Sequence, residues 1–200
     1  MNVKDSIRKR LNKSFAMISL VCSIGLVICG ISLFVISSQY HNTLTNYGFA
    51  QGDIGKAMTT FSEARSSLRA VIGYTDMNEI ADEQKDYETK KSAFEGYMAD
   101  VEKTIVTKAG KDAYAQVESA LNGYWTKADS ILKQGATTDN GASGAAQKKE
   151  IEELLPMYDN VYAALKNIMD INVTKGDEVQ NTLNVLMYIL IVLVVAIIAF

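Results

Sequence analysis

The sequence predicts an all-α fold, an antiparallel up-down-up-down four-helix bundle flanked by two transmembrane helices. Three observations predict it. Two apolar segments without a charged residue lie near the ends of the 200-residue chain, at 15–37 and 183–200. Between them, apolar residues recur at spacings of three and four, the period of an amphipathic helix. The same stretch holds the chain's one proline, Pro156, and no sustained alternation of apolar and polar residues, so strands are not expected.

The first apolar segment, 15–37, predicts a retained transmembrane helix rather than a cleaved signal peptide. The apolar run of a signal peptide is roughly 7 to 15 residues long. This segment has 23 residues, and at about 1.5 Å per residue it spans a hydrocarbon core of about 30 Å. The preceding tail, 1–14, carries five basic residues and one acidic residue. The positive-inside rule therefore places this tail in the cytoplasm.

The second apolar segment, 183–200, predicts a second transmembrane helix that returns the chain to the cytoplasm. It is still apolar at Phe200, so we expect this helix to be truncated and the protein to continue beyond it. The 38–182 segment is then an extracytoplasmic domain of about 145 residues, large enough to bury a core of its own. This organisation is that of a multi-pass cell-membrane protein.

The 38–182 segment divides into four amphipathic helices. We expect them at about 38–74, 80–106, 111–134 and 147–182, with breaks at 74–78, 108–110 and 135–144, where Gly, Asn, Asp, Ser and Thr are frequent. Short breaks between long helices favour antiparallel neighbours, which is the up-down-up-down arrangement. The expected core includes Ile54, Phe61, Leu68, Phe94, Tyr124 and Leu165.

Charge and composition exclude several functions. The 38–182 segment has 22 acidic and 15 basic residues, a net charge of −7, which argues against a nucleic-acid partner. The only histidine is His41, and the only cysteines, Cys22 and Cys29, lie inside the first apolar segment. The sequence therefore predicts no metal site, no cofactor, no catalytic residues and no enzymatic activity.

Two arginines are the most unusual residues of the 38–182 segment. It contains thirteen lysines, but Arg65 and Arg69 are its only arginines. Four residues apart, they lie on one face of the first helix, and Arg65 falls in the apolar stripe between Phe61 and Leu68. A guanidinium group offers a planar fork that matches a carboxylate, which lysine does not. The pair is a candidate site for a small anion.

The fourth helix supplies three further candidates. Counted from the membrane edges, Glu152 and Pro156 are level with the two arginines, about 40–46 Å out, and Tyr158 is just below. Pro156 removes a backbone hydrogen bond and frees a carbonyl for an ammonium group. Together these residues suit a small amino acid or organic acid. In the structural alternative, the arginines pair with Glu63, Glu152 or Glu153 at the edge of the core.

Small residues form two further patterns. Cys22, Gly25, Cys29 and Ser32 make a stripe along the first apolar segment, which favours close helix packing, either between protomers or by chance of composition. Glycines 48, 52 and 55 interrupt the first bundle helix just outside the membrane. Each costs up to about 1 kcal/mol relative to alanine, which indicates close packing of another helix or a flexible joint.

This layout resembles the sensory half of a bacterial methyl-accepting chemotaxis receptor. The resemblance covers the whole chain, and it is most specific in the tract YGFAQGDIGKAMTTFSEARSSLRAVIGY, residues 47–74, which is similar to the first bundle helix of such receptors. In the aspartate and serine members, ligand lies at a dimer interface between arginines of this helix and the start of the fourth. Arg65 and Arg69 match them in helix and height, but their spacing differs, and Met157 replaces the threonine that follows the proline in the aspartate receptors.

The resemblance implies a homodimeric transmembrane chemoreceptor. Its partners would be a small-molecule ligand such as a carboxylate, the membrane, and cytoplasmic chemotaxis signalling proteins reached through a HAMP linker and a methylated coiled coil after Phe200. A sensor histidine kinase or a cyclase with the same front end is an alternative, and so is a ligand-free membrane-tethered scaffold. The bundle would sense its solute either directly or through a solute-loaded binding protein.

Overall fold

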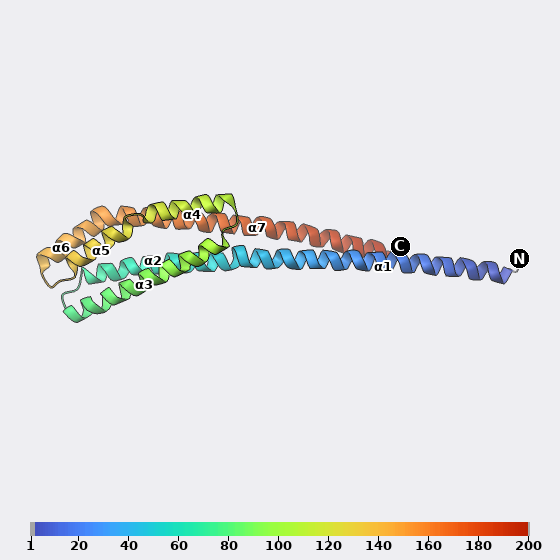
Figure 1. Ribbon diagram of the computed structural model, residues 1–200, viewed down its shortest axis with the longest axis horizontal. Helices are drawn as coiled ribbons and strands as arrows, with labels where there is room; N and C mark the ends of the chain where they lie inside the picture. Colours follow the sequence, from blue (N-terminus) through green and yellow to red (C-terminus); the bar gives the residue numbers. More distant parts are fainter. Residues whose placement is uncertain (1–2, 200) are drawn as a thin grey trace. The chain divides into compact units, whose positions relative to one another are not determined.

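The structure is a computed structural model that describes residues 3–199, with side-chain burial for residues 7–199. In chain order its elements are α1 (Val3–Thr43), the π-helix η1 (Leu44–Phe49), α2 (Ala50–Val71), α3 (Met77–Thr104), α4 (Lys108–Leu121), α5 (Tyr124–Gly135), α6 (Asn140–Lys149), the π-helix η2 (Glu150–Leu154) and α7 (Leu155–Ala199). The described residues contain helices and no strand (Figure 1), which confirms the all-α prediction.

The chain divides into two compact units. One comprises Met1–Leu44 and Asp177–Phe200, and the other comprises Thr45–Gly176. The first unit contains most of the two apolar segments, and the second contains the amphipathic helices, so we describe each by itself.

The Thr45–Gly176 unit is an antiparallel bundle of four helical columns. On neighbouring α2 and α3, Glu63 pairs with Lys90 at 2.9 Å, and four residues later Ser67 donates a hydrogen bond to Asp86, four residues earlier on α3. The two helices therefore run in opposite directions, side by side (Figure 1). The third column is α4 followed by α5, and the fourth is α6, η2 and the first part of α7. The predicted four-helix bundle is confirmed.

Polar contacts close the bundle between its first and fourth columns. At the end of α2, the carbonyl of Ile72 accepts hydrogen bonds from Ser143 and Gln147 on α6, at 2.5 and 2.8 Å. Ten residues before Ile72, Ser62 shares a 2.7 Å hydrogen bond with Tyr158 on α7. These contacts fix the register of α2 against α6 and α7, which determines what lies opposite the two arginines.

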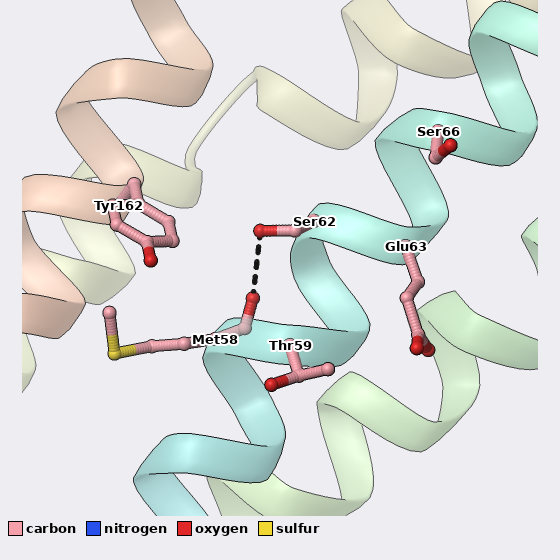
Figure 2. Close-up of a pocket in the computed structure, with 6 residues that line it drawn as sticks. All are labelled: Met58, Thr59, Ser62, Glu63, Ser66 and Tyr162. Carbon is pink, nitrogen blue, oxygen red and sulfur yellow. Dashed lines mark hydrogen bonds between the residues drawn. The ribbon is translucent and has the colours of Figure 1, made fainter.

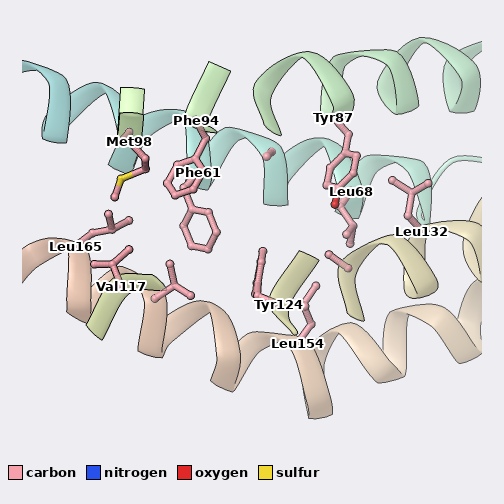
Figure 3. Packing of buried hydrophobic residues seen from close by; sticks show 14 of the residues in the cluster. Phe61, Leu68, Tyr87, Phe94, Met98, Val117, Tyr124, Leu132, Leu154 and Leu165 are labelled. Carbon is pink, nitrogen blue, oxygen red and sulfur yellow. The ribbon is translucent and has the colours of Figure 1, made fainter. Parts of the chain in front are cut away.

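The bundle core is centred on aromatic rings (Figure 3). Phe61 of α2 is fully buried. Its ring centroid lies 4.8 Å from that of Tyr124, 5.1 Å from Tyr158, 5.3 Å from Phe94 and 5.6 Å from Trp125. Aromatic pairs at such distances stabilise beyond their buried area. The core residues expected from periodicity are all buried: Ile54, Phe61, Leu68, Phe94, Tyr124 and Leu165.

The third predicted helix, 111–134, is interrupted in the structure. It divides into α4 and α5 at Asn122 and Gly123. Gly123 has a φ of 82°, a left-handed conformation that glycine adopts without steric cost. The apolar spacing continues through Tyr124, so periodicity alone did not reveal the break.

The predicted helix stop at 108–110 is wrong. α3 ends at Thr104, and Lys108 begins α4. Thr107 is the N-cap, because its hydroxyl accepts a hydrogen bond from the N–H of Gly110 at 3.0 Å. Gly110 thus belongs to the first turn of α4, and a Cβ there would lie 2.9 Å from Ile105.

The break predicted at 135–144 is shorter in the structure. α5 ends at Gly135, and α6 begins at Asn140 with Asp139 as its N-cap, whose carboxylate accepts from the N–H of Ala142 at 2.7 Å. Gly135 lies against α2, because a Cβ there would collide with Ile72 and stand 2.8 Å from the Cβ of Ala146. The glycine therefore allows α2, α5 and α6 to meet at this end of the bundle.

Replacing Gly135 by alanine is expected to destabilise the bundle by about 1–3 kcal/mol, the usual cost of overpacking a tight core. The matched control is Gly144→Ala in α6, where an added Cβ meets nothing within 4 Å. We expect that variant to be up to about 1 kcal/mol more stable, because alanine favours helix over glycine. Chemical denaturation followed by circular dichroism compares the two, and equal effects would contradict the packing role of Gly135.

The other unit contains two helices that are long and apolar enough to cross a membrane. Their most apolar 18-residue windows have mean hydropathies of 2.6 and 2.8, and each window is 6% buried. Within this unit Gly25 of α1 is buried, and a Cβ there would lie 2.6 Å from Ile197 of α7. The small-residue stripe of the first apolar segment thus packs, at Gly25, against the second apolar segment of the same chain.

Candidate functional site

The two arginines of α2 converge on one buried carboxylate, that of Glu150. Arg65 donates from Nε to Glu150 Oε1 at 2.9 Å, and its Nη2 lies 2.7 Å from the same oxygen. Arg69 Nε stands 3.9 Å from Glu150 Oε2. The exposed fractions of the side chains are 17% for Arg65, 62% for Arg69 and 3% for Glu150. The Arg65 side chain is thus largely buried at the edge of the bundle, whereas most of the Arg69 side chain is exposed.

A local irregularity of the fourth column places Glu150. The α-helix α6 ends at Lys149, and Glu150 is the first residue of η2, where the N–H of Leu155 bonds to the carbonyl of Glu150, five residues back. Pro156 follows directly and has no N–H to donate to the usual partner four residues earlier. Wide π turns of this kind are rare in helices overall, but those that occur often lie at functional sites.

Tyr158 is the third candidate residue that the structure brings to the arginines. The guanidinium carbon of Arg65 lies 4.6 Å from the centroid of the Tyr158 ring, within the range of a cation–π interaction. The same ring stacks on Phe61 at an interplanar angle of 5°, and its hydroxyl bonds to Ser62. Tyr158 therefore connects Arg65 to the aromatic core.

Glu152 and Pro156, the remaining candidates, lie apart from the arginines. Glu152 is exposed and pairs with Lys148 at 3.8 Å, one turn earlier on the same helix. Pro156 is exposed. Among the described ion pairs, neither Arg65 nor Arg69 contacts Glu152.

The partners of the structural alternative also differ from those expected. Glu63 pairs with Lys90, and Glu153 pairs with Lys127 at 2.5 Å. The Lys127 hydrogen bond holds the pKa of Glu153 below its ordinary value. The carboxylate that binds the arginines is instead Glu150, which sequence reasoning missed. One signal could have found it: Glu150 lies four residues from both Ala146 and Leu154, so it is a charge in an apolar stripe, as Arg65 is.

A shallow hollow lies alongside α2, and neither Arg65 nor Arg69 is among the residues that line it (Figure 2). Its volume is about 330 Å³. Ser62 and Ser66, each three residues before an arginine, line it with hydroxyl groups. Tyr162 of α7 closes one side, and its ring stacks on that of Tyr158 at 5.8 Å. The remaining lining residues are Met58, Thr59 and Glu63.

Small residues continue along the same side of α2. Gly52, Gly55, Thr59, Ser62 and Ser66 recur at spacings of three and four, and we call them the small-residue seam. A Cβ at Gly52 would meet nothing within 4 Å, and one at Gly55 would make only an ordinary contact with Met169. Close packing within the described chain therefore does not explain the glycine at position 52.

Burial also controls the ionisation of Tyr124, a fully buried tyrosine of the core. The pKa of Tyr124 is raised above its ordinary value, chiefly by burial, against an opposing effect of the positive charge on Arg65. Its phenol is therefore neutral at physiological pH. Within the described residues, no group of three or more His, Cys, Asp or Glu side chains is arranged to hold a metal ion.

Comparison with known proteins agrees with this architecture. No curated protein matches the chain. The model of one family, described as a four helix bundle sensory module for signal transduction, matches residues 2–187, which include the whole Thr45–Gly176 bundle. With two helices that could span a membrane, these features indicate a membrane protein. The chain therefore belongs to the family of four-helix-bundle sensory modules for signal transduction, the module of chemotaxis receptors.

Proposed function

We propose that this chain is the sensory part of a transmembrane chemoreceptor that detects a small extracytoplasmic solute carrying a carboxylate, such as an amino acid or organic acid. Family membership supports a sensory module, with a ligand and cytoplasmic signalling partners in general. The proposed class of ligand, a carboxylate, is inferred from Arg65 and Arg69.

The observation that carries the proposal is the outward-facing fork of Arg69 beside Arg65. The side chain of Arg69 is 62% exposed, and its nearest acidic oxygen is 3.9 Å away, longer than a charge-assisted hydrogen bond of about 2.7–2.9 Å. Its donors are thus available to a solute carboxylate. We assign the rest of a small molecule to the hollow lined by Ser62 and Ser66, each three residues before an arginine on α2.

Glu152 and Pro156 belong to the same proposal as the partners of a solute ammonium group. The carboxylate of Glu152 is exposed and held only by a 3.8 Å pair with Lys148. Pro156 withholds the donor that a helix normally supplies to the carbonyl of Glu152. An amino acid would use both of these acceptors, whereas a simple organic acid would need only the arginines.

The proposed topology follows the charges and the apolar segments. The basic tail 1–14 lies in the cytoplasm, the two apolar helices cross the membrane, and the bundle is extracytoplasmic. We infer a homodimer, in which the small-residue seam of α2 packs against a second copy, because small residues let helix backbones approach closely. A solute bound on α2 would then influence both protomers.

The binding proposal predicts that a suitable amino acid or organic acid raises the melting temperature of the full chain. At a hundred times its Kd, the acid stabilises the chain by about 2.7 kcal/mol. Arg69→Ala should abolish the shift by removing the free fork. Lys56→Ala on the same helix is the matched control, because Lys56 is also exposed and contacts nearby Asp53 and the Tyr97 ring but neither arginine nor Glu150.

The ligand-free scaffold is the second candidate, and the Arg65–Glu150 ion pair favours it. In that case no acid in a broad panel shifts the melting temperature, or Arg69→Ala leaves the shift unchanged. Either result contradicts a carboxylate site at the arginines.

A further inference from the structure

We propose that Glu150 is a built-in competitor at the arginine site, and that a solute carboxylate binds by displacing it. This inference rests on the proposed function, because it concerns the regulation of the same site. Under this proposal, ligand binding is coupled to the conformation of the fourth column, because both depend on whether Glu150 contacts the arginines.

The geometry of Glu150 is that of an internal ligand. One carboxylate oxygen, Oε1, takes two contacts from Arg65, and the other, Oε2, is directed to Arg69. A free carboxylate between two guanidinium groups would use the same donors. At 3.9 Å, however, the contact with Arg69 is incomplete. Glu150 therefore occupies the site without satisfying both arginines, and a solute not tethered to the chain could bind both.

The backbone at Glu150 offers a second arrangement. Glu150 begins the π-helix η2, and such a turn holds one more residue than an α-helical turn. Conversion of η2 to α-helix would rotate Glu150 relative to α7 by about 100°, the angle of one helical residue. That rotation would carry the carboxylate off the arginines. The same conversion would shift α6 relative to α7. Displacement of the Glu150 carboxylate would therefore change the conformation of the fourth column.

Neutralising the competitor should increase affinity. In Glu150→Gln the shape is retained, but the amide oxygen is a weaker partner for arginine than a carboxylate, because hydrogen bonds to charged groups contribute more. We expect a carboxylate to bind this variant about tenfold or more tightly than the wild-type chain, from the difference between neutral and charge-assisted hydrogen bonds. Glu153→Gln is the matched control: it removes the same charge three residues away, from a side chain that pairs with Lys127 and contacts neither arginine.

The experiment titrates acetate, succinate and L-aspartate into the full chain in lipid nanodiscs and measures Kd by calorimetry. The expected result is tighter binding to Glu150→Gln, no change in Glu153→Gln, and loss of the gain in Glu150→Gln combined with Arg69→Ala. Binding to Glu150→Gln alone, with none to wild type, also supports the inference.

Two failures are distinguishable. If wild type binds a probe through Arg69 but Glu150→Gln binds it no more tightly, Glu150 is not a competitor and the proposed function stands. If no probe binds either chain, both proposals are overturned.

A second measurement does not depend on the natural ligand. In Glu150→Ala the arginines lose their internal carboxylate, and acetate should raise the melting temperature of this variant above the effect of equimolar chloride. Glu153→Ala should show no such difference. A melting temperature of Glu150→Ala that responds equally to the two anions overturns the inference.

Discussion

Replacing Arg65 by alanine is expected to destabilise the bundle by about 3–5 kcal/mol, the usual cost of removing one partner of a buried ion pair. The reason is its partner: the Glu150 side chain is only 3% exposed, and Arg65 makes both of its short contacts. Without Arg65, the carboxylate is left in the bundle edge with Arg69 at 3.9 Å as its remaining cation. Urea denaturation of the full chain in detergent, followed by circular dichroism, measures the loss.

Arg69→Ala is the control for this variant, four residues along the same helix. Because its side chain is 62% exposed and its contact is long, we expect a change within about 0.5 kcal/mol, as for most surface substitutions. A similar small effect of Arg65→Ala would show that Glu150 reaches water without its partner, and it would contradict the buried pair.

Phe61→Ala is expected to have an equally large effect, about 3–5 kcal/mol. Phe61 is fully buried, and four other aromatic rings pack around it. The substitution would leave a cavity at the middle of the bundle and remove the surface on which Tyr158 stacks. We therefore expect it to weaken carboxylate binding as well, because Tyr158 lies under the Arg65 guanidinium.

Phe49→Ala controls for the loss of a phenylalanine as such. Phe49 ends η1, and 59% of its surface is exposed, so we expect a loss below about 1 kcal/mol. The same denaturation assay compares the two variants. Comparable losses in the free energy of unfolding of the two variants would contradict a large contribution of the aromatic cluster to stability.

Regular spacing explains why the helices and the core could be predicted. Ile54, Phe61 and Leu68 repeat every seven residues, and such a repeat puts them on one side of a helix whatever the helix packs against. The break predicted at 74–78 also rests on local signals, and within it Asp76 caps α3 by accepting from the N–H groups of Asn78 and Glu79. These features depend only on residues close together in the chain.

The interruptions were harder to predict, because competing local signals were present. Gly123 could have been read as a helix break, but the apolar spacing continues on both sides of it. Gly110 was interpreted as a helix stop, although the hydroxyl of Thr107 makes it part of a helix start. In both places the backbone follows the hydrogen bonds and packing available in the folded bundle.

The arginine site has one part that the sequence could predict and one part that only the folded bundle decides. Its unusual residues, Arg65 and Arg69, stand out in the sequence because a charge interrupts an apolar stripe. Their partner lies 85 residues from Arg65, and only the register of α2 against the fourth column brings Glu150, rather than Glu152, to the guanidinium groups. The π turn η2 alters that register by a residue, a change that no count along an ideal α-helix includes. Pairing across a bundle is decided by how complete helices dock, and local spacing carries no information on it.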